Sequence, residues 1–337
     1  MVHKRAVILG FLGMAALLTA GVSLSVGTVP IPLSSILKVA IEKLPYLQQY
    51  AGSKVPNRYL VILFDLRLPR ILLAMMVGAG LATAGCCMQG LFRNPMASPY
   101  VVGVSSGSAF GAALALLILP GIFSVPLVAF IFGLGTTFLV YRISWKKGKI
   151  PMERLLLTGI AVGFFFSAIT SLLMYTAAES VHRLVFWTMG GFWSSSWLRL
   201  LIASPFIGFG IPAIHFFARD LNIIQLGEES AAHLGVEVEL TKKILLVFSS
   251  LIVASAVSVS GVIGFVGLVI PHLTRILVGP DHRVLLPTCC LIGGIFLVGC
   301  DTLARTIIAP VELPVGIITA CFGAPFFIYL LIKGKGK

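Results

Sequence analysis

Runs of about 20 apolar residues, separated by short polar segments, repeat along nearly the whole chain. A helix that crosses a bilayer needs an apolar run of about this length, because each residue advances it by only about 1.5 Å. Gly261 and Gly264 form the turn where two runs are nearly continuous. The pattern predicts an all-α polytopic membrane protein with about ten transmembrane helices, at residues 6–27, 71–92, 100–119, 122–141, 155–177, 198–217, 244–261, 263–279, 285–308 and 314–332.

The first apolar run follows the basic residues Lys4 and Arg5, as it would in a secretory signal peptide. It is longer than the roughly 7–15-residue core of a signal peptide and lacks a clear small-x-small cleavage site. We therefore expect a retained first helix. An outer loop over residues 28–68 follows it, and residues 33–44 are a candidate interfacial helix within that loop.

Basic residues are concentrated in the segments that share a side with the N-terminus, notably residues 142–154 and 333–337. The positive-inside rule then places both termini in the cytoplasm. Five spans in each half invert the second half relative to the first, an arrangement common in transporters. A Leu-Pro…Gly-Ala spacing recurs at residues 68–79 and 313–324, but both copies open a span on the outer side. It therefore does not establish the repeat, and we treat residues 1–337 as a single transmembrane domain.

Composition agrees with a membrane protein, since 58% of residues are apolar and 11% are charged, against roughly a quarter charged in soluble domains. The net charge of +13 comes from clusters between apolar runs, which favours topology over nucleic-acid binding. The six cysteines lie inside apolar runs and indicate neither disulfides nor a metal site. No GxxxxGK[ST] or HExxH motif is present. We expect no catalytic residue and no cofactor.

Residues 226–243 are the long polar segment of the second half, and they carry four glutamates. Glu228 and Glu229 would begin a short helix, where the helix dipole favours negative charge. Gly235 is placed to end that helix. A helix this short needs packing against something else. A partner protein would supply that packing, and an ordinary solvated loop with one helical turn is the alternative.

Several segments together resemble the permease subunits of type II ABC importers, the FecCD family, over nearly the whole chain. The segments that carry the resemblance are LRLPR (66–70), QGLFRNPMASPYVVGVSSG (89–107), LGEESAAHLG (226–235), GFVGLVIPHLTR (264–275), DHRVLLP (281–287) and ELPVGIITACFGAPFF (312–327). The family imports cobalamin, haem and ferric siderophores. The resemblance implies a multi-pass protein of the plasma (inner) membrane, a homodimer that contacts lipid, two copies of a cytoplasmic ATPase, and an extracytoplasmic substrate-binding protein.

The resemblance also implies site residues. The coupling element that meets the ATPase corresponds to Leu226, Gly227, Glu228, Glu229, Ala231, Ala232, Leu234 and Gly235. Docking of the binding protein corresponds to Arg67, Arg70 and Arg305. The pathway of the family is lined by the fifth and tenth spans, where the polar candidates are Thr158, Ser167, Ser171, Tyr175 and Thr319.

Each assignment has a structural alternative. Arg67 and Arg70 could extend to lipid headgroups. Arg305 follows Asp301 by four residues, the spacing of an intrahelical ion pair. The pathway hydroxyls could serve hydrogen bonding between helices. His272 and His282, near the inner ends of their spans, could belong to a metal or proton site, but turn and interface contacts are favoured because no other His or Cys has ligand spacing.

The competing function is an ion-coupled secondary transporter with inverted repeats. Such a protein usually places a carboxylate near the middle of the membrane, and none of the predicted spans has one at its centre. A scaffold or receptor would have no use for the acidic segment. The sequence therefore favours an importer permease driven by a separate ATPase.

Overall fold

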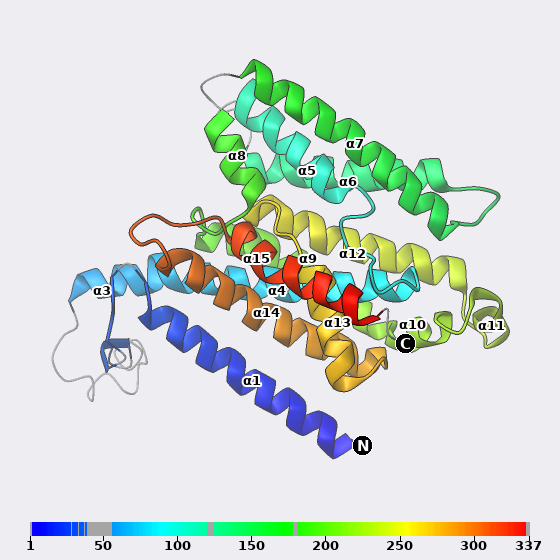
Figure 1. Cartoon of the computed structure of the whole chain (residues 1–337), viewed down its shortest axis with the longest axis horizontal. Helices are drawn as coiled ribbons and strands as arrows, with labels where there is room; N and C mark the ends of the chain where they lie inside the picture. Colours follow the sequence, from blue (N-terminus) through cyan, green and yellow to red (C-terminus); the bar gives the residue numbers. More distant parts are fainter. Residues whose placement is uncertain are drawn as a thin grey trace.

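The computed structural model describes residues 2–27, 29–32, 34–36, 38, 56–119, 124–177 and 181–334. All its named elements are helices (Figure 1), which confirms the all-α polytopic prediction. The helices are α1 (Val2–Ser25), α3 (Asn57–Val61), η2 (Ile62–Arg67), α4 (Leu68–Leu91), α5 (Val104–Ala113), η3 (Leu114–Ile118), α6 (Val125–Ser144), α7 (Met152–Thr176), α8 (Val181–Met189), α9 (Trp197–Phe216), α10 (Ala218–Ile224), α11 (Glu228–His233), α12 (Val238–Ser260), α13 (Val266–Val278), α14 (His282–Thr306) and α15 (Val315–Gly334).

Every apolar run singled out above corresponds to a helix. Within the described residues, 7 helices are long and apolar enough to cross a membrane, and three shorter apolar helices accompany them, at Val104–Ile118, Val266–Val278 and Val315–Tyr329. Ten spans therefore remain a prediction. The second span starts earlier than expected, because Asn57–Leu91 is one continuous helical stretch that includes the end of the predicted outer loop. Most of residues 33–44 lie outside the described residues.

Helix α4 is the centre of the bundle and is buried along nearly its whole length. Helices α9, α12, α13 and α14 surround it, while α5, α6, α7 and α8 form a layer on one side (Figure 1). Both chain ends lie at the end of the molecule that carries α10 and α11 (Figure 1). The membrane side on which the termini and the segment 226–243 lie, and the compartment they face, remain predictions.

Two pairs of glycines let the central helix approach its neighbours at backbone contact. A Cβ on Gly78 would lie 2.3 Å from the carbonyl oxygen of Gly293 in α14. A Cβ on Gly85 would lie 1.8 Å from the carbonyl oxygen of Gly267 in α13. The two α4 glycines are seven residues apart and therefore share a face. Small residues are what allow such close packing in a membrane.

We expect Gly85→Ala to lower the free energy of unfolding by about 3 kcal/mol, the upper end of the usual cost of overpacking. The added methyl group would meet backbone on α13, which cannot move aside without separating two helices. Thermal unfolding in detergent micelles measures the effect. Gly135→Ala in α6 is the matched control, since a Cβ there has no neighbour within 4 Å. Equal stability of the two variants would contradict this account of the packing.

Candidate coupling, docking and pathway sites

The predicted coupling segment contains a six-residue helix with defined ends. Gly227 precedes α11 with φ of 119°, a conformation that L side chains rarely adopt, and Glu228 and Glu229 form its first turn. At the other end Gly235 has φ of +84°. Its N–H donates to Ala232 O at 3.1 Å, and the Val236 N–H donates to Ala231 O at 3.0 Å. This is the Schellman arrangement, which requires a left-handed residue at the glycine position.

Helix α11 has an anchored face and a free face. Ala231 is fully buried, and Glu228 reaches Lys242 Nζ with its Oε1 at 2.6 Å. In contrast, Glu229 and Ala232 are exposed, and the flanking Leu226 and Leu234 are 69% and 59% exposed. The two acids that open the helix thus differ, because Glu228 forms an ion pair with Lys242, whereas Glu229 is exposed and forms no ion pair within the part of the chain that the structure describes.

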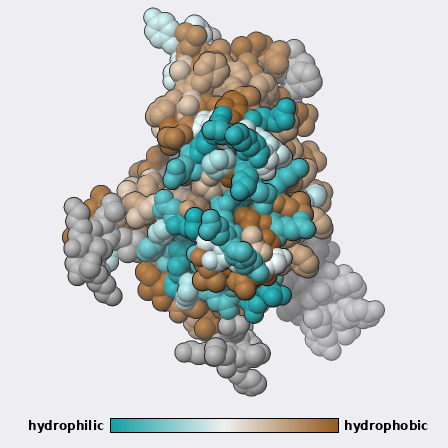
Figure 2. Space-filling model, turned by 90° about the vertical axis from the view of Figure 1, so that its right-hand side faces the viewer, coloured by the Kyte–Doolittle hydropathy of each residue, from teal (hydrophilic) through white to brown (hydrophobic). Residues whose placement is uncertain are grey.

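The end of the molecule that carries α10 and α11 is hydrophilic. Figure 2 shows polar residues gathered there and surrounded by apolar surface. A patch of this kind at the end of a bundle is expected where helices leave the bilayer. Leu226 and Leu234 are exposed apolar side chains that flank α11 in this part of the molecule.

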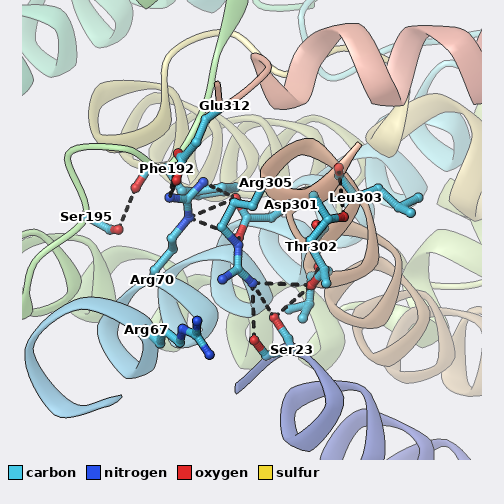
Figure 3. A network of polar contacts seen from close by, with 12 residues as sticks. Ser23, Arg67, Arg70, Phe192, Ser195, Asp301, Thr302, Leu303, Arg305 and Glu312 are labelled. Carbon is cyan, nitrogen blue, oxygen red and sulfur yellow. Dashed lines mark hydrogen bonds and ion pairs between the residues drawn. The ribbon is translucent and has the colours of Figure 1, made fainter. Parts of the chain in front are cut away.

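A buried charge network occupies the opposite end (Figure 3). Arg70 in α4 donates from Nη2 to Asp301 Oδ1 at 2.8 Å, and from Nη1 to Glu312 Oε2 at 2.8 Å. Arg305 Nε lies 3.2 Å from Asp301 Oδ2. The predicted ion pair within α14 is thereby confirmed. One buried carboxylate joins two guanidinium groups and ties α4 to α14.

Arg67 and Arg305 also contact the C-terminal end of α1 and the residues that follow it. The guanidinium of Arg67 donates to the carbonyl oxygens of Leu24 and Val29, and Arg305 Nη2 donates to Ser23 Oγ at 2.7 Å. The last carbonyl groups of a helix lack partners within it, so cations at that end satisfy them. The alternative in which Arg67 and Arg70 extend to lipid headgroups is wrong for this structure, because both side chains are buried in the protein.

Arg67, Arg70 and Arg305 line one cavity of ≈ 430 Å³ together with Glu312, Trp193 and Ser195. Three cations and the carboxylates of Asp301 and Glu312 leave an excess of positive charge. Arg67 is the arginine for which no carboxylate lies within ion-pair distance among the described residues. The cavity is therefore suited to accept a carboxylate.

The predicted pathway residues do not share one environment. Ser167, Ser171 and Tyr175 lie on the exposed face of α7, where Tyr175 is 88% exposed. Thr158 is half-buried on the same helix. Thr319 in α15 is fully buried and donates to Gly316 O at 3.1 Å, so it does not face any open surface of this protomer.

A groove of ≈ 460 Å³ between α5 and α7 brings together hydroxyl groups that the sequence did not single out. Ser105, Ser106 and Thr188 line it beside Ser167, and none of its described lining residues is charged. Glycines at 103, 159 and 163 are among its lining residues. In the sequence, the segment VSSG around Ser105 is only part of a family motif, because nothing in its spacing predicts that it lies opposite the fifth predicted span, which is α7.

His282 belongs to a structural contact. Asn222 Oδ1 lies 2.9 Å from the His282 backbone nitrogen and 2.8 Å from its ring Nδ1, and Asn222 Nδ2 donates to Asp281 Oδ1 at 2.8 Å. These bonds join α10 to the start of α14, as the interface interpretation predicted. Among the residues that the structure describes, no three His, Cys, Asp or Glu side chains come together as metal ligands.

Comparison with known proteins gives consistent matches. The model of the FecCD transport family matches residues 15–333. The chain is 47% identical to the cobalamin import system permease BtuC of Halobacterium salinarum, over 82% of this chain and 75% of that protein. It is 42% identical to the hemin transport system permease HmuU of Yersinia pestis, over 81% and 84%. A solved inward-facing ABC transporter assigned to the metal-chelate type is 36% identical, with a TM-score of 0.84 over 97% of this chain and 99% of that one.

Proposed function

Because this chain belongs to the FecCD transport family, as a multi-pass permease subunit of an ABC importer of the inner membrane, we propose that it works as a homodimer with two cytoplasmic ATPase subunits and an extracytoplasmic binding protein. Its cargo is cobalamin, haem or a ferric chelate. The permease itself carries out no hydrolysis and forms one transmembrane domain over residues 1–337. The observation that carries this proposal is α11, a helix anchored on one face and exposed on the other.

The coupling role of residues 226–235 rests on that division. Leu226, Glu229, Ala232 and Leu234 form the free surface, while Ala231 and Glu228 fix the helix to the bundle. A six-residue helix is not stable alone in water, but this one is held by its glycine ends and by Lys242. A preformed element of this kind loses little conformational entropy when the ATPase binds it.

Docking of the binding protein is assigned to the outer cavity, and Arg67 is its central residue. Arg70 and Arg305 are engaged with Asp301 and serve mainly to hold the cavity in shape. An incoming carboxylate would complete the charge balance around Arg67.

The pathway is assigned to the exposed face of α7 and the hydroxyl-lined groove beside it. This face carries Leu157, Ile160, Phe164 and Phe165 in exposed positions, so a second protomer facing it would enclose a mostly apolar passage. Neutral walls suit a bulky chelate that already satisfies its own metal. The buried Thr319 is a hydrogen-bonding residue of α15 in this arrangement.

Uptake into vesicles tests the proposal against its competitor. The permease is reconstituted with an ATPase subunit that co-purifies with it, and uptake of labelled haem, cobalamin and a ferric siderophore is measured with and without ATP. We expect uptake of one of these compounds, strictly dependent on ATP and on the binding protein. Uptake that persists without ATP and follows an ion gradient would instead establish a secondary transporter.

A further inference from the structure

Lys242 is a fully buried ammonium group beside the coupling helix. Its side chain is 1% exposed, and its Nζ lies 2.6 Å from Glu228 Oε1 and 3.1 Å from Glu239 Oε1. Glu228 begins α11, whereas Lys242 and Glu239 lie in the first turns of α12. A buried charge is tolerated only with close partners of opposite sign. Lys242 therefore fixes α11 to α12 at one defined point.

Glu239 makes a second contact that leaves this pair of helices. Its Oε2 accepts the backbone N–H of Ile150 at 2.9 Å. Ile150 is buried at the end of the turn between α6 and α7. The next residue, Pro151, is the N-cap of α7. Both oxygens of Glu239 are thus used, one for Lys242 and one for the start of α7.

The turn that Glu239 holds is itself stiff. Lys146 and Lys149 exchange two backbone hydrogen bonds of 3.0 Å, and Lys147 and Gly148 have φ of 49° and 78°. Two successive left-handed residues closed by such a pair form the tight turn found in two-residue hairpins. Ile150 follows this turn and is joined directly to Pro151, the N-cap of α7, so a displacement of Ile150 is passed to the start of α7.

We propose that Lys242 and Glu239 form the mechanical connection that carries movement of the coupling helix α11 to α7. This inference rests on the proposed function, in which α11 meets the ATPase and α7 borders the pathway. The covalent linker after α11 already joins it to α12. The contribution of the Glu228–Lys242–Glu239 triad is the lateral link to α7, which no covalent segment near α11 provides. Lys242 and Glu239 are positioning residues, since neither touches the cargo.

The test uses the complete importer in vesicles and measures cargo molecules transported per ATP hydrolysed. We expect Lys242→Met and Glu239→Ala to lower this ratio about tenfold, within the usual range of coupling between sites, while the ATPase still co-purifies. Lys243→Met and Glu237→Ala are matched controls, because both side chains are exposed neighbours for which no ion pair is formed among the described residues. A purely structural defect would lower transport and hydrolysis together and leave the ratio unchanged.

A double variant distinguishes loss of the connection from misfolding of the permease. Lys242→Met combined with Glu239→Leu replaces the buried pair by apolar side chains, which folded proteins often tolerate, and the side chain of Glu228 is 39% exposed to solvent. We expect the low ratio to persist in this folded variant, and a wild-type ratio would overturn the proposal. If Leu234→Asp keeps the ATPase bound and coupled, the docking assignment is wrong. If Leu234→Asp releases the ATPase while Glu239→Ala keeps the wild-type ratio of cargo to ATP, the docking assignment stands. Only the proposed connection from α11 to α7 is then wrong.

Discussion

Asp301→Asn is expected to lower the free energy of unfolding by about 3–5 kcal/mol, the usual cost of removing one partner from a buried ion pair. Asp301 is 1% exposed and serves both Arg70 and Arg305. The amide keeps the shape of the carboxylate but cancels its charge, so two buried guanidinium groups lose their shared partner. Denaturant or thermal unfolding in detergent micelles measures the loss.

Two further variants serve as references for the change in the free energy of unfolding of Asp301→Asn. Asp65→Asn removes an exposed acid at the same end of the molecule and is expected to change stability by less than about 0.5 kcal/mol. Glu312→Gln affects a more exposed partner of Arg70 and is expected to cost about 1 kcal/mol. The network would be unimportant for stability if Asp301→Asn and Asp65→Asn unfolded at the same temperature.

The helices could be predicted from the sequence because a bilayer leaves the backbone few choices. Each peptide group in the hydrocarbon region must be hydrogen-bonded internally, so a long apolar run is nearly sufficient to predict a helix. The helices α3 and η2 before α4 were not predicted, because Asp65 and Arg67 interrupt the apolar run while the helix continues through them. In the structure Arg67 turns inward to the end of α1, which no local pattern predicts.

Contacts between distant residues limited the prediction of the sites. The ion pair of Asp301 with Arg305 follows from their spacing of four residues, but its pairing with Arg70 depends on how α4 packs against α14. In α11, the first-turn acids and Gly235 predicted the ends of the helix. The inward orientation of Glu228 was not predictable, because its partner Lys242 is brought near only when α12 folds back beside α11.

These long-range contacts change which residues of the coupling segment are expected to meet the ATPase. The sequence put both Glu228 and Glu229 forward as acids that open the helix. Because Glu228 is held by Lys242, its removal would act on the permease itself. A clean test of docking must therefore use side chains that are exposed and have no role inside the protomer, and Leu226 and Leu234 meet this condition.

We expect the double variant Leu226→Asp/Leu234→Asp to lower ATPase binding and ATP-driven uptake by about 100-fold or more. Burial of one leucine side chain is worth about 1.5–3 kcal/mol, and two such losses correspond to a factor of about 100 or more in affinity. The introduced carboxylates would add a desolvation cost at the interface. Co-purification of the ATPase and vesicle uptake measure the two effects.

Folding of this variant should remain normal, because neither leucine contributes to the core of the permease. Leu226→Met/Leu234→Met keeps two flexible apolar side chains at the same positions and should retain most binding, since such exchanges usually cost less than about 1.5 kcal/mol. The contrast between the two double variants isolates apolar contact from the backbone geometry of α11. Normal ATP-driven uptake by the aspartate variant would show that the motor protein engages another surface.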